Sequence, residues 1–340
     1  MSINLYTIDR KLLHLQKKLN HFSLLHPTNE QEEKKKTLED NTYNPQFIYT
    51  KHPYNLPYIA TQLMRIRTDE SIMGKLLRDK RNELLKKVLL FHTIGKSKFT
   101  SSSLNLYGKP PPELVTQAVA CLTPTSEPSR KTLSAKIVKL KLHQALATYN
   151  LTNWKIKTKP ITTLALFDGA HRTLILNTKE SFHLDDVQRF IVHEIGTHLV
   201  RYHNGKKQKH TLFHAGFPQY LSTEEGLAVY NEERAGLLTK DLLSGYAART
   251  IAVSLALTHS FSSVYTHLLD YFPPDEAWRI TLRAKRGVND TSKPGAFTKD
   301  YFYFKGWHEV KTFLSTGGNL RDLYIGKIGL QHTPYLPFIS

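Results

Sequence analysis

Cysteine is nearly absent from this chain, and so are the signatures of several common protein classes. The single cysteine, Cys121, excludes a disulfide within the chain and is typical of a reducing compartment. No apolar run reaches the roughly 18 residues of a membrane-spanning helix, and charged residues interrupt the N-terminal segment where a secretory signal would be apolar. We therefore expect a cytoplasmic protein with no membrane span and no secretory signal.

Negative charge is also scarce. Lys and Arg together number 47, against 29 Asp and Glu, so the formal net charge is +18. Such a field attracts acidic partners such as nucleic acid, acidic protein tails or anionic lipid. Cysteine-rich zinc fingers, phosphate-binding glycine loops and RNA-binding aromatic signatures are absent from the sequence. A nucleic-acid role therefore has only the charge in its favour.

Helical patterns dominate the 340 residues, with one interruption of strand character. We expect residues 1–43 to form a short helix followed by a polar loop or linker, and residues 44–150 to be helical. Period-two alternation then predicts three strands over residues 154–158, 163–167 and 172–177. Asp168-Gly169 indicates a hairpin between the last two. We expect a small antiparallel sheet, whose strand over 172–177 offers an edge for an extended substrate.

A long helix is predicted over residues 184–203, and it carries the most informative residues of the chain. Asp185 and Asp186 suit its first turn, and Asn204-Gly205 end it. Within it, His193 and His198 flank Glu194 in an apolar run. Two neutral imidazoles hold zinc, and a neighbouring carboxylate takes the proton of a zinc-bound water. The competing interpretation, two unrelated histidines on a buried helix, leaves Glu194 buried without a partner.

The spacing of the two histidines carries a structural prediction. Zinc-protease histidines usually stand at i and i+4, but His193 and His198 stand at i and i+5. On a regular α-helix they would point about 140° apart. A local π-bulge brings them together, and Gly196 between them eases the distortion. We therefore expect the helix to be widened around Gly196.

The metal site needs a third ligand from elsewhere in the chain. Glu224 and Glu225 are the best candidates, at the start of a second helix where Gly226 allows a close approach of two helices. A competing role for Glu225 is a capping box with Ser222. Three further imidazoles are weaker alternatives as ligands: His203, His210 and His214.

Together these residues resemble a known family. His193-Glu194-Ile195-Gly196-Thr197-His198, followed by Thr223-Glu224-Glu225-Gly226-Leu227-Ala228, is similar to the motifs of the microtubule-associated tyrosine carboxypeptidases and their bacterial relatives. Weaker likenesses extend over roughly residues 40–330. Their positions are residues 44–49, Leu106-Tyr107-Gly108, Phe297-Thr298-Lys299-Asp300 with Tyr303 and Gly306, and Gly326-Lys327-Ile328.

The resemblance implies an α+β, predominantly helical, zincin-like metallopeptidase with a small antiparallel sheet beside the motif helix. It implies one catalytic domain over 44–335: a helical part over 44–150, a sheet and metal-binding part over 151–240, and a helical part over 241–335. By position, His193, His198 and Glu225 are the zinc ligands and Glu194 is the catalytic base. The implied reaction is removal of a C-terminal residue, which in animal members is the terminal tyrosine of α-tubulin.

A carboxypeptidase also reads the free carboxylate of its substrate, and a fixed cation does this well. Arg201 is the first candidate and Lys327 the second, with a salt bridge between helices as the competing role for Arg201. Tyr303 is a candidate donor to the developing oxyanion. The expected partner is an acidic protein tail such as that of tubulin. Two alternatives stay open: a zinc endopeptidase or aminopeptidase, and a catalytically silent basic binding protein with a structural metal site.

Overall fold

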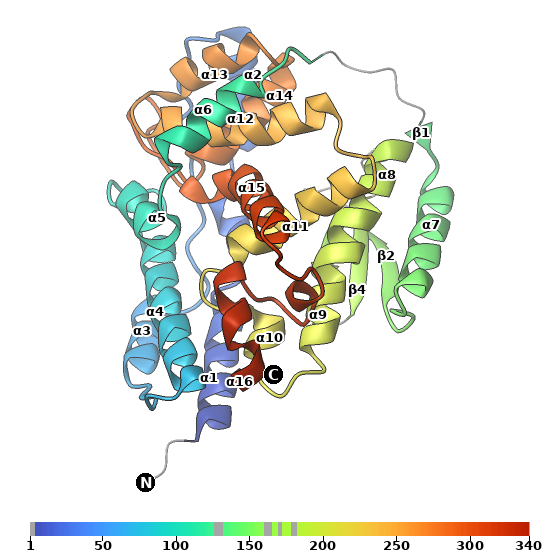
Figure 1. Ribbon diagram of the computed structural model, residues 1–340. Helices are drawn as coiled ribbons and strands as arrows, with labels where there is room; N and C mark the ends of the chain where they lie inside the picture. Colours follow the sequence, from blue (N-terminus) through green and yellow to red (C-terminus); the bar gives the residue numbers. More distant parts are fainter. Residues whose placement is uncertain (1–3, 126–131, 160–164, 169–171, 178–181, 340) are drawn as a thin grey trace.

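Helices form most of the molecule, with two small sheets at one side (Figure 1). The computed structural model of the chain describes residues 4–125, 132–159, 165–168, 172–177 and 182–339. None of the described helices is both long and apolar enough to span a membrane. The α-helices are α1 (Leu5–Lys18), α2 (Glu30–Glu39), α3 (Leu56–Met64), α4 (Ile72–His92), α5 (Phe99–Tyr107), α6 (Pro112–Ala120), α7 (Ala135–Thr148), α8 (Leu184–Phe190), α9 (Val200–Gly205), α10 (Leu212–Ala215), α11 (Leu221–Arg234), α12 (Lys240–Ala256), α13 (Phe261–Leu269), α14 (Pro274–Lys285), α15 (Phe302–Ser315) and α16 (Leu336–Ile339).

Wider and tighter helical turns connect these elements. The widened segment is the π-helix η2 (Ile191–Leu199), which joins α8 to α9 without a break. The 3₁₀ turns are η1 (Phe22–Leu25), η3 (Thr298–Tyr301), η4 (Asp322–Tyr324) and η5 (Leu330–Tyr335). Several helices begin where a side-chain oxygen accepts a hydrogen bond from a backbone N–H of the first turn, as sequence preferences at N-caps predict. These caps are Asn4, Asn55, Ser71, Ser134, Thr239 and Ser260.

The N-terminal part departs from the prediction of a polar loop after the first helix. Helix α2 occupies Glu30–Glu39 within that stretch. It is held by polar contacts rather than by an apolar face: the buried Glu33 carboxylate accepts hydrogen bonds from the Gln46 backbone N–H at 2.7 Å and the Tyr43 hydroxyl at 2.9 Å. Because hydrophobic periodicity does not record such contacts, the linker prediction was wrong here.

The three-stranded sheet has the order β2–β4–β3, formed by β2 (Lys155–Lys159), β4 (Thr173–Asn177) and β3 (Ala165–Asp168). Strands β3 and β4 are antiparallel, as predicted, and the turn at residues 169–171 lies outside the described residues. Strands β2 and β4 are parallel, so the antiparallel prediction was wrong for that pair. Alternation reveals a strand but not its neighbours, and β4 lies in the middle, with four of its five residues buried. Both edges of β4 are therefore occupied, and the expected substrate pairing along it is also wrong.

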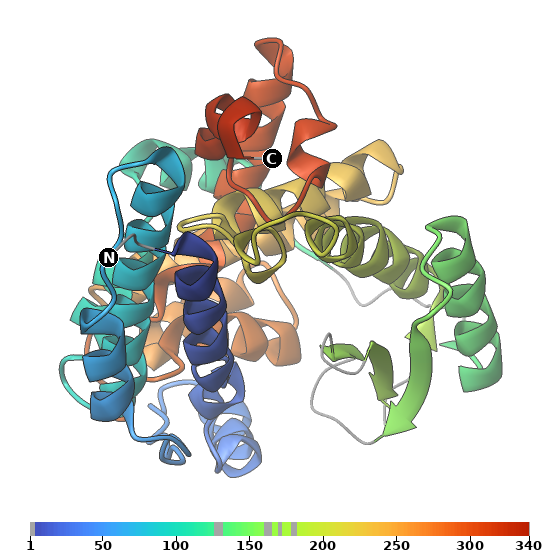
Figure 2. The ribbon, with the colours of Figure 1, turned by 90° about the horizontal axis from the view of Figure 1, so that it is seen from below.

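The short strands β1 (Thr132–Leu133) and β5 (Phe182–His183) form a separate antiparallel pair. One apolar cluster joins the sheet and α7 to the motif helix, with Leu142, Leu174 and Ile195 at its centre. In Figure 2 this part lies on the opposite side of the motif helix and α11 from α1, α3 and α4. A second cluster packs α1, α3 and α4 together, and a third packs α12, α13 and α14.

A close crossing of α11 and α15 fixes the remaining part of the site. A Cβ atom added to Gly226 would lie 2.0 Å from the backbone carbon of Gly306, and one added to Gly306 would lie 1.8 Å from the Ser222 carbonyl oxygen. Real Cβ atoms do not approach backbone this closely, so both positions require glycine. The crossing determines where Glu224 and Glu225, one turn into α11, are held.

Candidate active site

The motif helix is widened, as its histidine spacing predicts. The π-helix η2 contains the whole motif, and the Thr197 hydroxyl donates to the Val192 carbonyl, five residues earlier, at 3.0 Å. The rings of His193 and His198 consequently lie on one side, with centroids 4.9 Å apart and planes at 83°. Two imidazole nitrogens thus face the same point from a single helix.

Gly196 has a second reason to lack a side chain. A Cβ atom there would lie 2.5 Å from the Tyr149 hydroxyl, at the C-terminal end of α7. Tyr149 therefore packs directly on the widened turn. The sequence indicated the backbone distortion at Gly196, but this contact depends on the position of α7.

Glu225 reaches the two imidazole rings from α11. Its Oε2 lies 3.9 Å from His193 Nε2 and 3.7 Å from His198 Nε2. A zinc ion at about 2.1 Å from two ligand atoms allows them to be at most about 4.2 Å apart, so both separations suit a shared ion. Potential ligand atoms of His193, Glu194 and His198 also lie within 4.8 Å of one another. The residues present therefore fit a metal ion, with His193, His198 and Glu225 around it and Glu194 beside it.

The capping role considered for Glu225 is not what the structure has. Helix α11 begins without a side-chain cap, and the Ser222 hydroxyl donates instead to Glu309 Oε2 at 2.6 Å. The other oxygen of Glu225, Oε1, accepts from Lys299 Nζ at 3.0 Å. Glu225 is thus buried, charged and paired, with Oε2 left toward the histidines.

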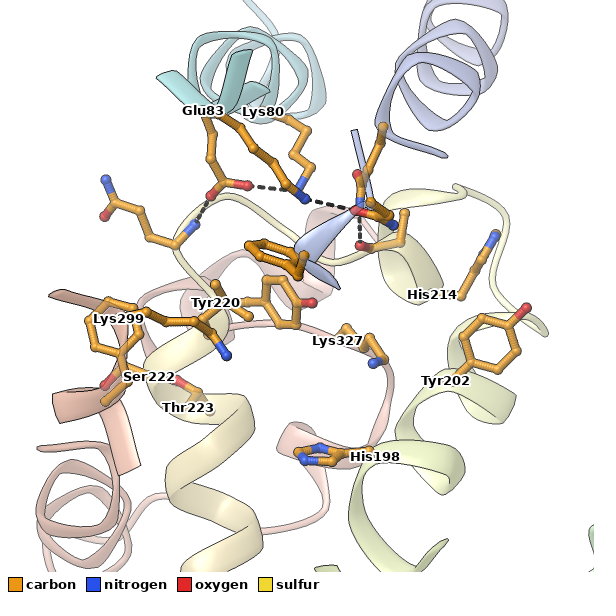
Figure 3. A pocket seen from close by; sticks show the side chains of 18 of the residues that line it. Lys80, Glu83, His198, Tyr202, His214, Tyr220, Ser222, Thr223, Lys299 and Lys327 are labelled. Carbon is orange, nitrogen blue, oxygen red and sulfur yellow. Dashed lines mark hydrogen bonds and ion pairs between the residues drawn. The ribbon is translucent and has the colours of Figure 1, made fainter. Parts of the chain in front are cut away.

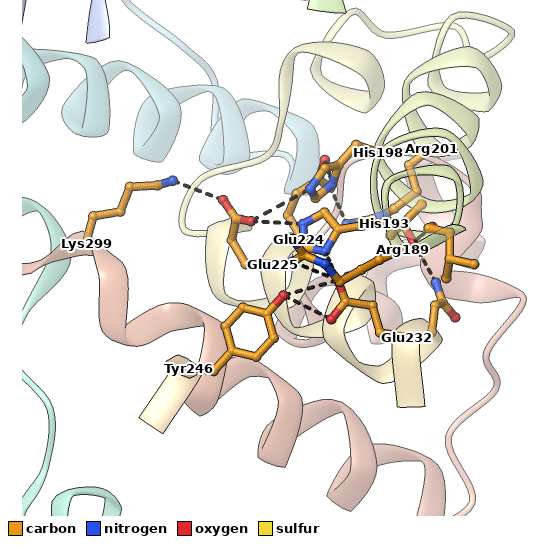
Figure 4. Close-up of polar contacts among 12 residues, drawn as sticks. Arg189, His193, His198, Arg201, Glu224, Glu225, Glu232, Tyr246 and Lys299 are labelled. Carbon is orange, nitrogen blue, oxygen red and sulfur yellow. Dashed lines mark hydrogen bonds and ion pairs between the residues drawn. The ribbon is translucent and has the colours of Figure 1, made fainter. Parts of the chain in front are cut away.

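Two further carboxylates support the histidines from behind (Figure 4). His193 Nδ1 donates to Glu232 Oε1 at 2.8 Å, and the Tyr246 hydroxyl donates to the same carboxylate, 2.9 Å from Oε2. His198 Nδ1 lies 3.0 Å from Glu224 Oε1. Carboxylates at the outer ring nitrogen fix the tautomer and orientation of metal-binding histidines. The hydrogen bond to Glu232 therefore leaves the lone pair of His193 Nε2 toward the metal position, and the Glu224 carboxylate lies beside the outer nitrogen of His198.

Arg201 is placed differently from the prediction. Its side chain is fully buried; Nε donates to the Leu323 carbonyl at 2.7 Å, Nη2 donates to the Ile328 carbonyl at 2.5 Å, and Nη1 donates to Glu224. These contacts use the guanidinium to join the motif helix, α11 and the segment before η5. Arg201 is thus the inter-helix salt bridge weighed as the alternative, and the prediction that it reads a substrate carboxylate was wrong.

Local charge keeps the site carboxylates ionised. Burial alone would raise the pKa of Glu225, but Lys299 and the two histidines outweigh it and lower the pKa to about 2. Burial likewise opposes ionisation of Glu224, yet Lys327 and Arg201 hold its pKa well below its usual range. Both groups are anionic at neutral pH, and carboxylates bind metal ions in this state.

Tyr303 and Lys327, the other two residues singled out from sequence, both lie close to the site. The Tyr303 ring stacks on the ring of His193, with centroids 6.4 Å apart, and on the ring of Tyr246 at 5.5 Å. Lys327 Nζ lies 2.8 Å from Glu224 Oε1. The three alternative histidines lie outside the group: His210 stacks on Tyr6 and His214 meets Tyr202 edge-on, while His203 is absent from the metal-competent group among the described residues.

A cavity of about 1820 Å³ opens beside His198, between the motif helix, the N-terminal helices and the C-terminal segment (Figure 3). Its charged lining is mainly basic, with Glu83 and Glu309 as the acidic exceptions. The lining lysines are Lys17, Lys80, Lys86, Lys87, Lys206, Lys207, Lys299, Lys305 and Lys327. The cavity is therefore lined mainly by positive charge, and its lining includes His198 of the candidate metal site.

A comparison with known families identifies the chain. A family model described as "Microtubule-associated tyrosine carboxypeptidase" matches residues 33–338, nearly the full length. The chain belongs to this family. The match begins inside α2 and includes every residue of the candidate site.

Individual relatives are more distant and much longer. The chain is 34% identical over 122 residues to microtubule-associated tyrosine carboxypeptidase 1 of Mus musculus, an alignment that covers 34% of this chain and 25% of the mouse protein. It is 31% identical over 150 residues to the putative tyrosine carboxypeptidase MATCAP2 of Homo sapiens, covering 42% of this chain and 28% of the human protein. These alignments thus span only about a quarter of the relatives' length.

Two residues of the site were not predicted from the sequence. Glu232 supports His193, and its signal was present: it follows Glu225 by seven residues, which places both carboxylates on one face of α11. Lys299 pairs with Glu225, although it was noted only as part of the resemblance. Glu224, weighed only as a possible ligand, instead anchors His198, Arg201 and Lys327.

Proposed function

We propose that this chain is a zinc-dependent metallocarboxypeptidase with a zincin-like catalytic domain over residues 44–335. One observation carries the proposal. Potential ligand atoms of His193, Glu194 and His198 lie within 4.8 Å of one another, and Glu225 Oε2 lies 3.9 Å and 3.7 Å from the Nε2 atoms of the two histidines. A purely structural metal site needs no such additional carboxylate.

The residues divide the chemistry among themselves. Bound zinc supplies Lewis acidity and lowers the pKa of a coordinated water to about 7. Glu194 accepts a proton from the attacking water and delivers it to the leaving amine. Among the described residues, no salt bridge engages the Glu194 carboxylate, so it stays available for this transfer. Glu232 holds His193 in the required tautomer, and the Glu224 carboxylate pairs electrostatically with His198. Tyr303 is the candidate donor to the developing oxyanion.

The substrate we propose is the C-terminal residue of an acidic protein tail. The lysine-lined cavity beside His198 provides the charge that attracts such a tail, with Lys327 as one contact because it lines the cavity and keeps 19% of its side chain exposed. The relatives are named microtubule-associated tyrosine carboxypeptidases. By extension we propose a terminal tyrosine, a tubulin-like tail and a cytoplasmic site of action.

The test uses peptides that share an acidic body and differ in their C-terminal residue, read by mass spectrometry. Loss of single C-terminal residues, fastest for tyrosine, is the expected result, with about one zinc per chain in the purified protein. Glu194→Gln should abolish this release and keep the zinc, while Glu276→Gln on the surface of α14 should change neither. Internal cuts, release from the N-terminus, or activity that survives Glu194→Gln would refute the proposal.

A further inference from the structure

Arg249 is the one arginine near the candidate metal site that lacks a partner among the described residues. Its guanidinium lies over two aromatic rings, with Cζ 4.9 Å from the Tyr246 centroid and 4.7 Å from the Tyr303 centroid. The neighbouring Arg283 and Arg286 both bind Asp300, at 2.6 Å and 3.2 Å. No hydrogen bond or ion pair to Arg249 is found within the described part of the chain. Its charge is therefore held in place but not neutralised.

The surroundings of Tyr303 carry an excess of positive charge. The Arg249, Arg283 and Lys299 cations lie 4.7, 5.9 and 6.0 Å from the centre of its ring. Asp300 is shared between two arginines, and Glu225, the partner of Lys299, also faces the metal position. Burial, and then the like charge of Arg283, lower the pKa of Arg249. An added anion at Arg249 would relieve both effects.

The distance from the metal site suits one particular anion. Tyr303 contacts both residues: its ring centroid lies 4.7 Å from Arg249 Cζ and 6.4 Å from the ring centroid of His193. In a bound peptide, the terminal carboxylate lies one residue, about 3.5 Å, beyond the scissile carbonyl. A hydrogen bond from an arginine guanidinium to the carboxylate oxygens adds about 2.8 Å. Measured through the Tyr303 centroid, the guanidinium lies no more than about 11 Å from the His193 ring centre, and one terminal residue with its hydrogen bond to arginine reaches about 6 Å beyond the scissile carbonyl.

We propose that Arg249 binds the C-terminal carboxylate of the substrate and so makes the site specific for chain ends. This inference rests on the proposed carboxypeptidase function and assigns to Arg249 the task first predicted for Arg201. The rings of Tyr246 and Tyr303 fix the plane of the guanidinium, which favours bidentate hydrogen bonding to a carboxylate. The Lys299 ammonium lies 6.0 Å from the centre of the Tyr303 ring and adds electrostatic attraction.

Binding is measured apart from turnover, on the zinc-loaded Glu194→Gln protein. The probes are N-acetyl-L-tyrosine and N-acetyl-L-tyrosinamide, which differ only in the terminal carboxylate, titrated by calorimetry or NMR. We expect the acid to bind more tightly than the amide. Arg249→Gln should weaken binding of the acid about tenfold or more and leave the amide unchanged. Arg279→Gln is the matched control, because its side chain is 64% exposed on α14 and pairs with Glu276.

Turnover supplies an independent readout in the protein with Glu194 intact. Arg249→Gln should lower kcat/KM for peptide acids about tenfold or more at unchanged zinc content, and Arg249→Lys should recover part of the loss. Should Arg249→Gln fail to fold, Arg249→Lys keeps the charge but cannot form two parallel hydrogen bonds, and it should bind N-acetyl-L-tyrosine over the amide with a smaller preference. An unchanged acid-to-amide ratio in the folded variant, or no preference in the parent, overturns the inference. If the enzyme is active and either result is found, only the carboxylate-binding role of Arg249 is refuted. If the parent protein releases no C-terminal residue, the carboxypeptidase proposal itself is refuted.

Discussion

The crossing of α11 and α15 makes Gly226→Ala a sharp test of how the site is built. The new Cβ would lie 2.0 Å from the Gly306 backbone carbon, where unstrained carbon contacts begin at about 3.5 Å. The helices must therefore separate by about 1.5 Å. Overpacking of this kind costs about 1–3 kcal/mol, of which better helix propensity returns about 1. Because Glu225 precedes Gly226, the same shift moves its carboxylate away from His193 and His198.

Gly245→Ala is the matched control. Gly245 also lies inside a helix, α12, but a Cβ there meets nothing within 4 Å. That variant should gain about 0.5–1 kcal/mol from helix propensity alone. We expect Gly226→Ala to unfold at lower temperature than the parent, to bind zinc more weakly in competition with a chelator, and to lose turnover. Equal stability of the two alanine variants, or unchanged zinc affinity in Gly226→Ala, would refute the reasoning.

Three further substitutions test the surroundings of the site and the pH response of the fold. Glu232→Gln removes the carboxylate behind His193 and should weaken zinc binding about 10- to 100-fold in chelator competition; unchanged affinity would contradict its supporting role. Glu224→Gln leaves the buried Arg201 without its anion and should destabilise the fold by about 3–5 kcal/mol in urea unfolding, and a loss below 1 kcal/mol would show that carbonyls alone satisfy it. Burial lowers the pKa of His332 from 6.5 to about 4, so the unfolded chain binds more protons than the folded one between these values. This histidine should therefore remove up to about 3 kcal/mol of stability as the pH falls from 6.5 to 4; His332→Asn should flatten that slope in pH-dependent unfolding, and an unaltered slope would assign it to other groups.

Local patterns in the sequence were enough for the main parts of the candidate site. The types and spacing of His193, Glu194 and His198 predicted both a metal site and the widened helix that serves it. Gly226 marked a close approach of two helices, and α11 begins at Leu221, just before Glu224 and Glu225, where a helix start was predicted. Helix and strand periods repeat within a few residues, so a single segment contains the whole signal.

Only the tertiary structure decided what each charged side chain does. Arg201 was expected to face a substrate, but it binds carbonyls more than 120 residues further along the chain. Glu232, Lys299 and Arg249 acquire their roles from neighbours on other helices. The antiparallel prediction for β2 failed for the same reason, because strand neighbours depend on long-range packing.

The sequence by itself therefore determined the histidine–glutamate motif and the widened helix that carries it. The tertiary structure determined which carboxylates support that motif and which cations stay unpaired beside it. The physical reason is that backbone periodicity is set by each residue's near neighbours. The energy of a buried charge depends instead on whichever groups the fold brings within a few ångströms of it.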